Sequence, residues 1–274
     1  MTRLAVLGDV HGNLAALEAV LEHAEQLHID GFVVIGDVVV GAPDSLACWE
    51  RVAGLGCPVL RGNHEAYVSI FGTAAADPAW STPQFAPVAW AVEQLGDVAR
   101  RLLGALPFSL ILPDLPDVLF VHASLRSDRD NLDTYTPDDV LAAMFPDLSA
   151  RYVVRGHDHV AATRHWRTHQ LITNGSVGIP LSGIPEAQYL ILEVGAAPHV
   201  TFYSVPYDVE ATLKRFHDTD YLIEAGPTAH LFFREVAFAT PQLIPFLRGY
   251  VRWSAGGTLS LEAAVRAFCQ FGSP

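Results

Sequence analysis

The chain has 274 residues; half of them are hydrophobic, 17% are charged, and 30 acidic against 17 basic residues give a formal net charge of −13. This composition predicts a globular protein with a sizeable core, and its negative balance argues against binding to a nucleic-acid backbone or an anionic membrane. Three cysteines without CxxC spacing predict reduced thiols, and no apolar stretch reaches the ~18 residues that span a bilayer. The first residues run into an apolar strand pattern without the features of a signal peptide, so we expect a cytoplasmic location.

The first half of the chain alternates short apolar runs with helical patterns. The runs that predict buried strands are residues 4–7, 32–35, 59–60, 118–121 and 152–154. Between them, Asn13 is placed to cap one helix and residues 44–55 have the pattern of a second. Pro87 is expected to open a third helix and Thr136 to cap a fourth.

The second half is rich in strands, and helices return after Asp208. The predicted strands are residues 170–173, 189–194 and 199–205. The order βαβα followed by a β-meander predicts a fold of the α+β class, with two sheets packed face to face and helices outside. Three aromatic residues are expected to pack helices over this sandwich rather than to line a cleft: Trp80, Phe85 and Trp90.

A break at residues 225–227 separates the end of the chain from the rest. We therefore expect a main domain over residues 1–224 and a C-terminal extension over residues 225–274. An apolar stripe after Ser260 predicts a helix in this extension, which is expected to pack on the main domain. It can cap a site, form a homo-oligomer interface or simply pack on the sheet, and the sequence leaves these alternatives open.

Residues that bind metals follow directly after five predicted strands. The groups are Asp9-Val-His11, Gly36-Asp37, Gly62-Asn63-His64-Glu65, His122 and Gly156-His157-Asp158-His159. Because strands deliver the residues that follow them to one edge of a sheet, we expect these side chains to lie together. Carboxylate, amide and imidazole ligands in one set suit Mn, Fe, Zn, Ni or Co better than Mg or Ca. The sequence therefore predicts a centre of two divalent transition-metal ions.

Individual residues in these groups suit different roles. Asp9 and His11 lie two positions apart and can bind one ion, whereas Asp37 can bridge two ions because each carboxylate oxygen can serve a different metal. His64 stands beside a predicted ligand but is expected to point into the cleft, where it can bind a phosphoryl group or protonate a leaving oxygen. Glu65 is interpreted as structural, with its carboxylate accepting hydrogen bonds from nearby backbone N–H groups.

Taken in order, Asp-x-His, Gly-Asp, Gly-Asn-His-Glu, a lone His and Gly-His-x-His resemble the calcineurin-like metallophosphoesterase superfamily over roughly residues 3–205. The resemblance implies a four-layer αββα sandwich of two mixed sheets, with two ions and a catalytic His64. It also implies two ligand sets: Asp9, His11, Asp37 and His159 for the first ion, and Asp37, Asn63, His122 and His157 for the second. The loop at 174–178 resembles that of the bacterial small phosphodiesterase branch, without its proline.

Departures from the family pattern bear on the substrate. Protein Ser/Thr phosphatases place an Asp-Arg-Gly stretch after Gly-Asp, and Val40 stands here where that Asp would be, which argues against phosphoprotein hydrolysis. An Arg-Asp-Gly that often follows the loop of the bacterial branch is replaced by residues 181–183, Leu-Ser-Gly. The remaining basic candidates for substrate binding are Arg61, Arg126 and Arg155.

The leading hypothesis is a dinuclear metal-dependent phosphoesterase. It would hydrolyse a small phosphodiester, nucleotide or phosphoanhydride by in-line attack of a hydroxide that bridges the ions. One alternative is a phosphomonoesterase, including a phosphoprotein phosphatase, on the same centre. Another is a non-catalytic metal-binding scaffold, against which the complete ligand set and His64 argue. The expected partner is a small phosphorylated substrate.

Overall fold

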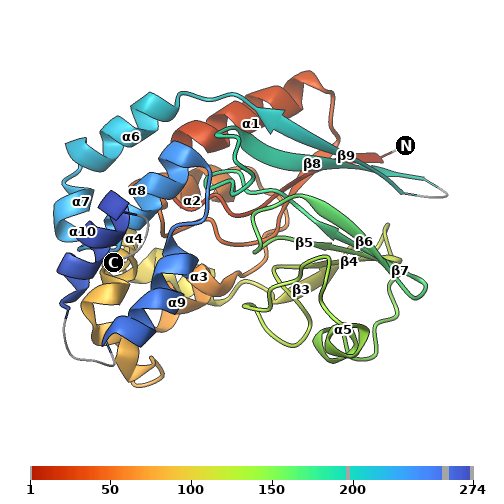
Figure 1. The fold of residues 1–274 in the computed structure, drawn as a ribbon. Coiled ribbons are helices and arrows are strands. Elements are labelled where there is room, and N and C mark those ends of the chain that lie inside the picture. The colour runs from red at the N-terminus through yellow and green to blue at the C-terminus, as the bar shows by residue number, and fades with distance from the viewer. Residues whose placement is uncertain (1, 196–197, 255–258, 272–274) are drawn as a thin grey trace.

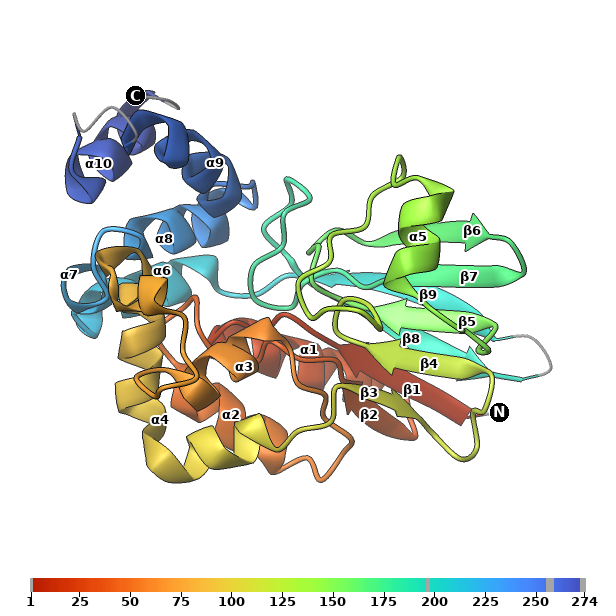
Figure 2. The same ribbon diagram turned by 90° about the horizontal axis from the view of Figure 1, so that it is seen from below.

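Two β-sheets lie face to face at the centre of the molecule (Figures 1 and 2). The computed structural model describes residues 2–195, 198–254 and 259–271. One sheet has the strand order β2 (Gly31–Val34), β1 (Thr2–Leu7), β8 (Ala187–Val194) and β9 (His199–Val205). The other has the order β3 (Ser109–Ile111), β4 (Val118–Val121), β5 (Tyr152–Arg155), β7 (His169–Thr173) and β6 (Ala162–Trp166). Both sheets are mixed, since β1 pairs parallel with β2 and β4 with β5, whereas β8 and β3 pair antiparallel.

Alternate strand residues fill the space between the two sheets. Val6 and Leu190 of the first sheet pack with Phe120, Val154 and Ile172 of the second, and all five are fully buried. Because successive side chains of a strand point to opposite faces, the neighbours of these residues point outward to the helical layers. The structure therefore confirms the predicted αββα sandwich of the α+β class.

Helices cover the outer face of each sheet. The first sheet shares a core with α1 (Leu14–Gln26), α2 (Ser45–Ala53) and α4 (Ala86–Gly104). The second sheet packs on α5 (Asp138–Met144). Helix α3 (Asn63–Ile70) packs on α4. Two short 3₁₀ turns, Pro78–Ser81 and Pro83–Phe85, connect α3 to α4. None of the helices in the described ranges combines the length and apolarity that crossing a bilayer requires.

The predicted N-terminal cap is present in α1 and absent in α5. The Asn13 side chain accepts a hydrogen bond from the N–H of Ala16 at 3.2 Å, as its position before α1 predicts. Thr136 does not cap α5, which begins at Asp138, because its hydroxyl accepts from the N–H of Asp133 at 3.0 Å instead. A local turn therefore uses the side chain that was predicted to begin the helix.

The C-terminal part of the chain is helical and lies at one end of the sandwich (Figure 1). Its helices are α6 (Val209–Asp218), α7 (Tyr221–Glu224), α8 (Ala229–Phe238), α9 (Leu243–Ser254) and α10 (Leu261–Phe271). Phe232 of α8 packs in one core with Ala42 and Ile179, and the Tyr221 hydroxyl donates to the carbonyl of Gly41 at 2.8 Å. The C-terminal helices are thereby anchored to the loops of the sandwich, while the boundary after residue 224 stays a prediction.

The buried carboxylate of Glu65 holds the loop that follows β2. It accepts hydrogen bonds from four backbone N–H groups, those of Asp37 at 2.7 Å, Val38 at 2.7 Å, Val39 at 3.3 Å and Gly62 at 2.8 Å. The loop carries no regular structure of its own, so its N–H groups depend on this side chain for partners. The structural interpretation of Glu65 is confirmed.

Replacing Glu65 by glutamine should destabilise the protein. A glutamine presents an NH₂ group toward backbone N–H donors and cannot accept from all four, so we expect the free energy of unfolding to fall by about 3 kcal/mol. Urea denaturation followed by circular dichroism measures the change. The control is Glu22→Gln on an exposed position; equal stability of the two variants would contradict the role of Glu65.

Candidate metal centre

All seven predicted ligands and His64 come together at one edge of the sandwich. Asp9 and His11 follow β1, Asp37 follows β2, His122 follows β4, and His157 and His159 follow β5. Asp9, His11 and His159 place ligand atoms within 4.8 Å of one another, and so do Asp37, His122 and His157. The loops after parallel strands therefore meet as the sequence predicts.

In the first group, two imidazoles turn their Nε2 atoms toward one point. His11 Nδ1 lies 2.8 Å from the carbonyl of Val40 and His159 Nδ1 lies 2.7 Å from that of Ile179. A carbonyl only accepts, so both Nδ1 atoms carry a proton, and each Nε2 is left to bind a second proton or a cation. The two Nε2 atoms are 3.0 Å apart, and Asp9 Oδ1 lies 3.3 Å from the Nε2 of His159. Because the pKa of His159 is raised, its Nε2 holds a proton in the metal-free protein, and a cation would take the place of that proton, as at metal-binding histidines.

The second group repeats this arrangement. His122 Nδ1 lies 2.9 Å from the carbonyl of Ile35, and its Nε2 is 3.3 Å from Asp37 Oδ2. The amide oxygen of Asn63 lies 3.1 Å from His122 Nε2. The same amide position is 3.1 Å from His157 Nδ1 and 3.2 Å from Asp37 Oδ2. Turning the amide would let its NH₂ group donate to these atoms, whereas the oxygen completes a set of ligands for a cation.

Asp37 lies between the two groups. Its Oδ2 is 3.3 Å from His122 Nε2 in the second group and 3.9 Å from His11 Nε2 in the first. Its Oδ1 accepts from the backbone N–H of His64 at 2.9 Å, which fixes the direction of the carboxylate. Asp37 is therefore the residue that can serve both ions, as its predicted bridging role requires.

Glycines allow the loops to approach these carboxylates. A Cβ at Gly62 would lie 2.2 Å from Asp37 Oδ1, and a Cβ at Gly156 would lie 2.6 Å from Asp9 Oδ2. Real Cβ atoms do not approach other atoms this closely, so any side chain at either position would displace a predicted ligand. The glycines in Gly-Asn-His-Glu and Gly-His-x-His thus have a steric reason.

The loop at 174–178 supports Asp9 from behind. The Ser176 hydroxyl donates to the Asp9 carbonyl at 2.7 Å, and the Gly178 N–H donates to it at 3.0 Å. The Asn174 side chain donates to the carbonyl of Val6 at 3.0 Å. This loop therefore positions the first predicted ligand through its backbone, and the bacterial branch that the loop resembles stays a prediction.

Several predicted ligands adopt left-handed backbone conformations. The φ angles are 57° at Asp9, 51° at His11, 53° at Asp37, 72° at His157 and 58° at His159. Non-glycine residues rarely adopt positive φ, and such strain persists only where the surroundings enforce it. Val40, a β-branched residue in the loop that contains Asp37, has a φ of 65° and presents its carbonyl to His11. Clustered strain of this kind is typical of functional sites.

The buried carboxylates and two imidazoles shift one another's pKa. Burial is the largest single effect on Asp9 and would raise its pKa, but His159 and His122 together outweigh burial and lower that pKa to about 2. Burial likewise opposes a charge on His122, but Asp37 and Asp9 together raise its pKa to about 10, and the pKa of Asp37 lies well below the usual range. In the absence of cations, protons on these imidazoles balance the carboxylates.

Three other imidazoles are held neutral. Burial, with charge from neighbouring histidines, lowers the pKa of His11 and of His157 to about 3. Burial also lowers the pKa of His64, whose Nε2 is 3.9 Å from Asp37 Oδ2. His64 Nδ1 has no hydrogen-bond partner among the described residues, and the side chain lines the open cavity over the centre. His64 thus borders the space over the centre, and its contact with a substrate stays a prediction.

A cavity of about 370 Å³ opens over the centre. Its walls include Tyr67, Phe85 and Arg129, together with residues of α8 and α9. The expectation that Phe85 only packs helices is therefore wrong, because the turn before α4 brings its ring to the cavity. Trp80 packs on Tyr67 with ring centroids 4.9 Å apart. Trp90 packs on Tyr221 of α7 as expected, at 5.5 Å.

None of the three arginines predicted to bind substrate is among the described residues that line this cavity. The described lining of the cavity includes Arg129 but not Arg61, Arg126 or Arg155. Arg155 is fully buried and donates to the carbonyls of Ala123 and Asp130 and to the carboxylate of Asp158, which makes it structural. Arg126 pairs with the side chain of Asp130 at 2.7 Å. Arg129 lies shortly after His122 in the sequence, and this proximity to a predicted ligand is the feature that could have indicated its position at the cavity.

Comparisons with known proteins agree with this geometry. The sequence model of the family described as calcineurin-like phosphoesterase matches residues 2–161, more than half of the chain. An uncharacterized protein of Methanocaldococcus jannaschii is 26% identical over 208 residues, which are 69% of this chain and 82% of that protein. A metallophosphoesterase from Sphaerobacter thermophilus has a similar crystal structure, with a TM-score of 0.69 and 26% identity over 86% of this chain and 98% of that chain.

A hypothetical protein from Pyrococcus horikoshii OT3 shares the fold, with a TM-score of 0.68 and 20% identity over 84% of this chain and 98% of that chain. The family match covers the segments that carry Asp9, Asp37, Asn63, His122 and His159. The chain therefore belongs to the calcineurin-like phosphoesterase family and is a hydrolase that acts on phosphoester bonds.

Proposed function

We propose that this enzyme is a dinuclear metal-dependent phosphoesterase that hydrolyses a small phosphodiester, nucleotide or phosphoanhydride. The observation that carries the proposal is the position of Asp37 Oδ2, 3.3 Å from His122 Nε2 and 3.9 Å from His11 Nε2, on the floor of the cavity. Asp9, His11, Asp37 and His159 would hold one ion, and Asp37, Asn63, His122 and His157 the other. Their mixed nitrogen and oxygen ligands suit Mn, Fe, Co, Ni or Zn.

Bound cations would supply Lewis acidity toward the phosphoryl oxygens and an activated water at neutral pH. The chain's own residues provide the positioning. The three histidines whose Nδ1 atoms face backbone carbonyls keep their Nε2 atoms available, and Asp37 stays ionised because its pKa is lowered. The three free thiols, Cys48, Cys57 and Cys269, fit the proposed cytoplasmic location.

His64 is the proposed catalytic residue. Its backbone N–H donates to Asp37 Oδ1, which holds the residue beside the centre, and its imidazole ring lines the cavity. An imidazole in this place can donate a hydrogen bond to a phosphoryl oxygen or a proton to the leaving oxygen. The lowered pKa leaves the ring neutral in the free enzyme, so the approach of an anionic substrate is what favours its protonated form.

A substrate panel tests the proposal. Purified protein loaded with Mn²⁺, Ni²⁺ or Fe²⁺ should release nitrophenol from bis-p-nitrophenyl phosphate, which reports diesterase activity. The monoester p-nitrophenyl phosphate tests the alternative of a phosphomonoesterase on the same centre. No turnover of either compound with any of these ions would overturn the proposal and favour a non-catalytic scaffold.

Asp37→Asn should abolish both metal occupancy and activity. The amide loses the negative charge that balances two cations, and its NH₂ group cannot act as a ligand. Metal content after gel filtration, measured by mass spectrometry, and turnover of the diester check the outcome. Asp139→Asn, at an exposed position on α5, serves as the control. Normal metal content with full turnover in Asp37→Asn would rule out the bridging role.

His64→Ala should retain the metals but lower kcat by about 10²–10⁴-fold, because it removes an acid or phosphoryl donor rather than a ligand. Metal content and steady-state kinetics separate the two roles, and His165→Ala on exposed β6 is the matched control. Loss of metal in His64→Ala would identify His64 as a ligand instead.

Metal binding should release protons. In the metal-free protein the pKa of His122 is raised to about 10, so at pH 7 its Nε2 carries a proton that a cation must displace. We expect release of about one proton from this residue at pH 7, and an affinity that rises with pH until it approaches that pKa. Calorimetric titration of Mn²⁺ in two buffers of different ionisation enthalpy counts the protons. Binding without proton release would contradict the assignment of His122.

A further inference from the structure

The cavity over the metal centre has one wall made by the C-terminal helices. Phe232 and Glu235 of α8 line it, together with Leu243, Ile244 and Leu247 of α9. The three α9 residues are spaced i, i+1 and i+4, so they lie on one face of the helix. This face is apolar, and Ile244 is 50% exposed where it lines the cavity. The C-terminal helices thus present an apolar surface to the space next to the centre.

The wall is held in place by a buried carboxylate. Glu235 is 5% exposed and its Oε1 accepts from the N–H groups of Gln242 and Leu243, each at 2.9 Å. These N–H groups lie at the start of α9, so the side chain ties the first turn of α9 to α8. The Arg234 guanidinium donates to the Gln242 side chain at 3.1 Å and closes the same turn. The apolar face is therefore preorganised.

The rest of the cavity away from the metal ligands is also largely apolar. Tyr67 and Phe85 contribute aromatic rings with centroids 6.4 Å apart, and Val88 and Leu181 add aliphatic side chains. Arg129 is a cation in this lining, and its guanidinium lies 5.7 Å from the Tyr67 ring centroid. A substrate that carries several charged phosphates would meet few cationic partners here among the described residues, whereas an uncharged ring would bury its surface.

From this arrangement we propose that α8 and α9 select phosphate esters with an uncharged aromatic organic group. The phosphoryl group lies at the metal centre, and the ring lies between the aromatic pair Tyr67 and Phe85 and the α9 face of Leu243, Ile244 and Leu247. The proposal rests on the proposed phosphoesterase function and deepens it by naming the substrate class. A cavity of about 370 Å³ is of the size that holds one such ligand.

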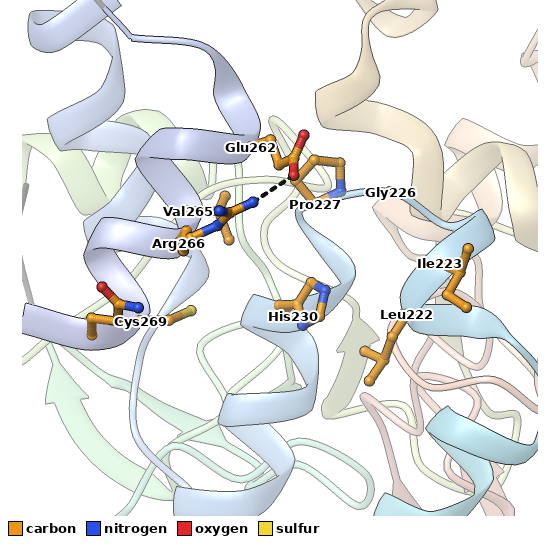
Figure 3. A pocket seen from close by; sticks show the side chains of 10 residues that line it. Leu222, Ile223, Gly226, Pro227, His230, Glu262, Val265, Arg266 and Cys269 are labelled. Atoms are coloured by element: carbon orange, nitrogen blue, oxygen red, sulfur yellow. Dashed lines mark hydrogen bonds and ion pairs between the residues drawn. The ribbon is translucent and has the colours of Figure 1, made fainter.

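A second hollow offers a control position. It lies between α7, α8 and α10, is about 610 Å³ in volume and is lined by residues that include Ile223, His230, Glu262 and Arg266 (Figure 3). Glu262 and Arg266 form an ion pair at 2.7 Å, so each satisfies the other's charge. This hollow shares no lining residue with the cavity over the centre in the described part of the chain. Ile223 is 78% exposed there, which makes it a match for Ile244.

The test compares Ile244→Ser with Ile223→Ser. Phenylphosphonate and methylphosphonate, which are not hydrolysed, are titrated by calorimetry into the Mn²⁺-loaded protein, and kcat/KM is measured for phenyl phosphate and methyl phosphate. In wild type and Ile223→Ser the phenyl compound should bind about 10-fold or more tightly than the methyl compound. In Ile244→Ser this ratio should fall about 10-fold, with the loss in KM rather than kcat.

An equal effect of Ile244→Ser on both compounds, or no effect on either, would overturn the proposal. The conservative variant Ile244→Val, which keeps the apolar surface and is expected to fold in any case, should retain the ratio; loss of the ratio there would also overturn it. Absence of hydrolysis of these monoesters and also of bis-p-nitrophenyl phosphate would instead refute the phosphoesterase proposal, while the phosphonate affinities would still decide whether the α9 face binds the ring.

Discussion

The structure is organised around the free-energy cost of burying two carboxylates and several histidine side chains close together. His11 Nε2 and His159 Nε2 face each other at 3.0 Å, and Asp9 and Asp37 are fully or almost fully buried beside them. Without a cation, only protons on imidazoles balance this charge. Several features near the centre keep these groups in place: carbonyls fix the histidine tautomers, glycines leave room for the carboxylates, and several loop residues adopt strained φ angles.

The support for this cluster comes from polar groups that never meet a substrate. Glu65 satisfies four backbone N–H groups of the loops around Asp37, and the loop at 174–178 holds the backbone of Asp9. Arg155 stabilises the neighbouring loops through carbonyl contacts and Asp158. The strands bring the ligands near one another, but these side chains determine how the loops present them.

The proposed phosphoesterase chemistry and the proposed substrate preference come from different parts of the chain. The proposed metal ligands belong to loops of the sandwich that follow its strands. The apolar wall belongs to α8 and α9, which are tied together by Glu235 and attached to the sandwich through Phe232 and Tyr221. A change in these helices can alter the organic group that is accepted without a change in the centre.

Periodicity and motif order in the sequence determined the sandwich and the strand ends that carry the proposed ligands. They also determined that Asp37 and His64 lie at these strand ends. These features follow from local rules, because alternation specifies a strand and a strand end specifies an edge of the sheet. The direction of each arginine and the course of the C-terminal helices depended on the tertiary structure. Arg155 turns inward because buried carbonyls need donors, and Arg129 reaches the cavity through a loop that has no periodic pattern. Only packing brought Phe85 and Ile244, which lie far apart in the sequence, to the same cavity.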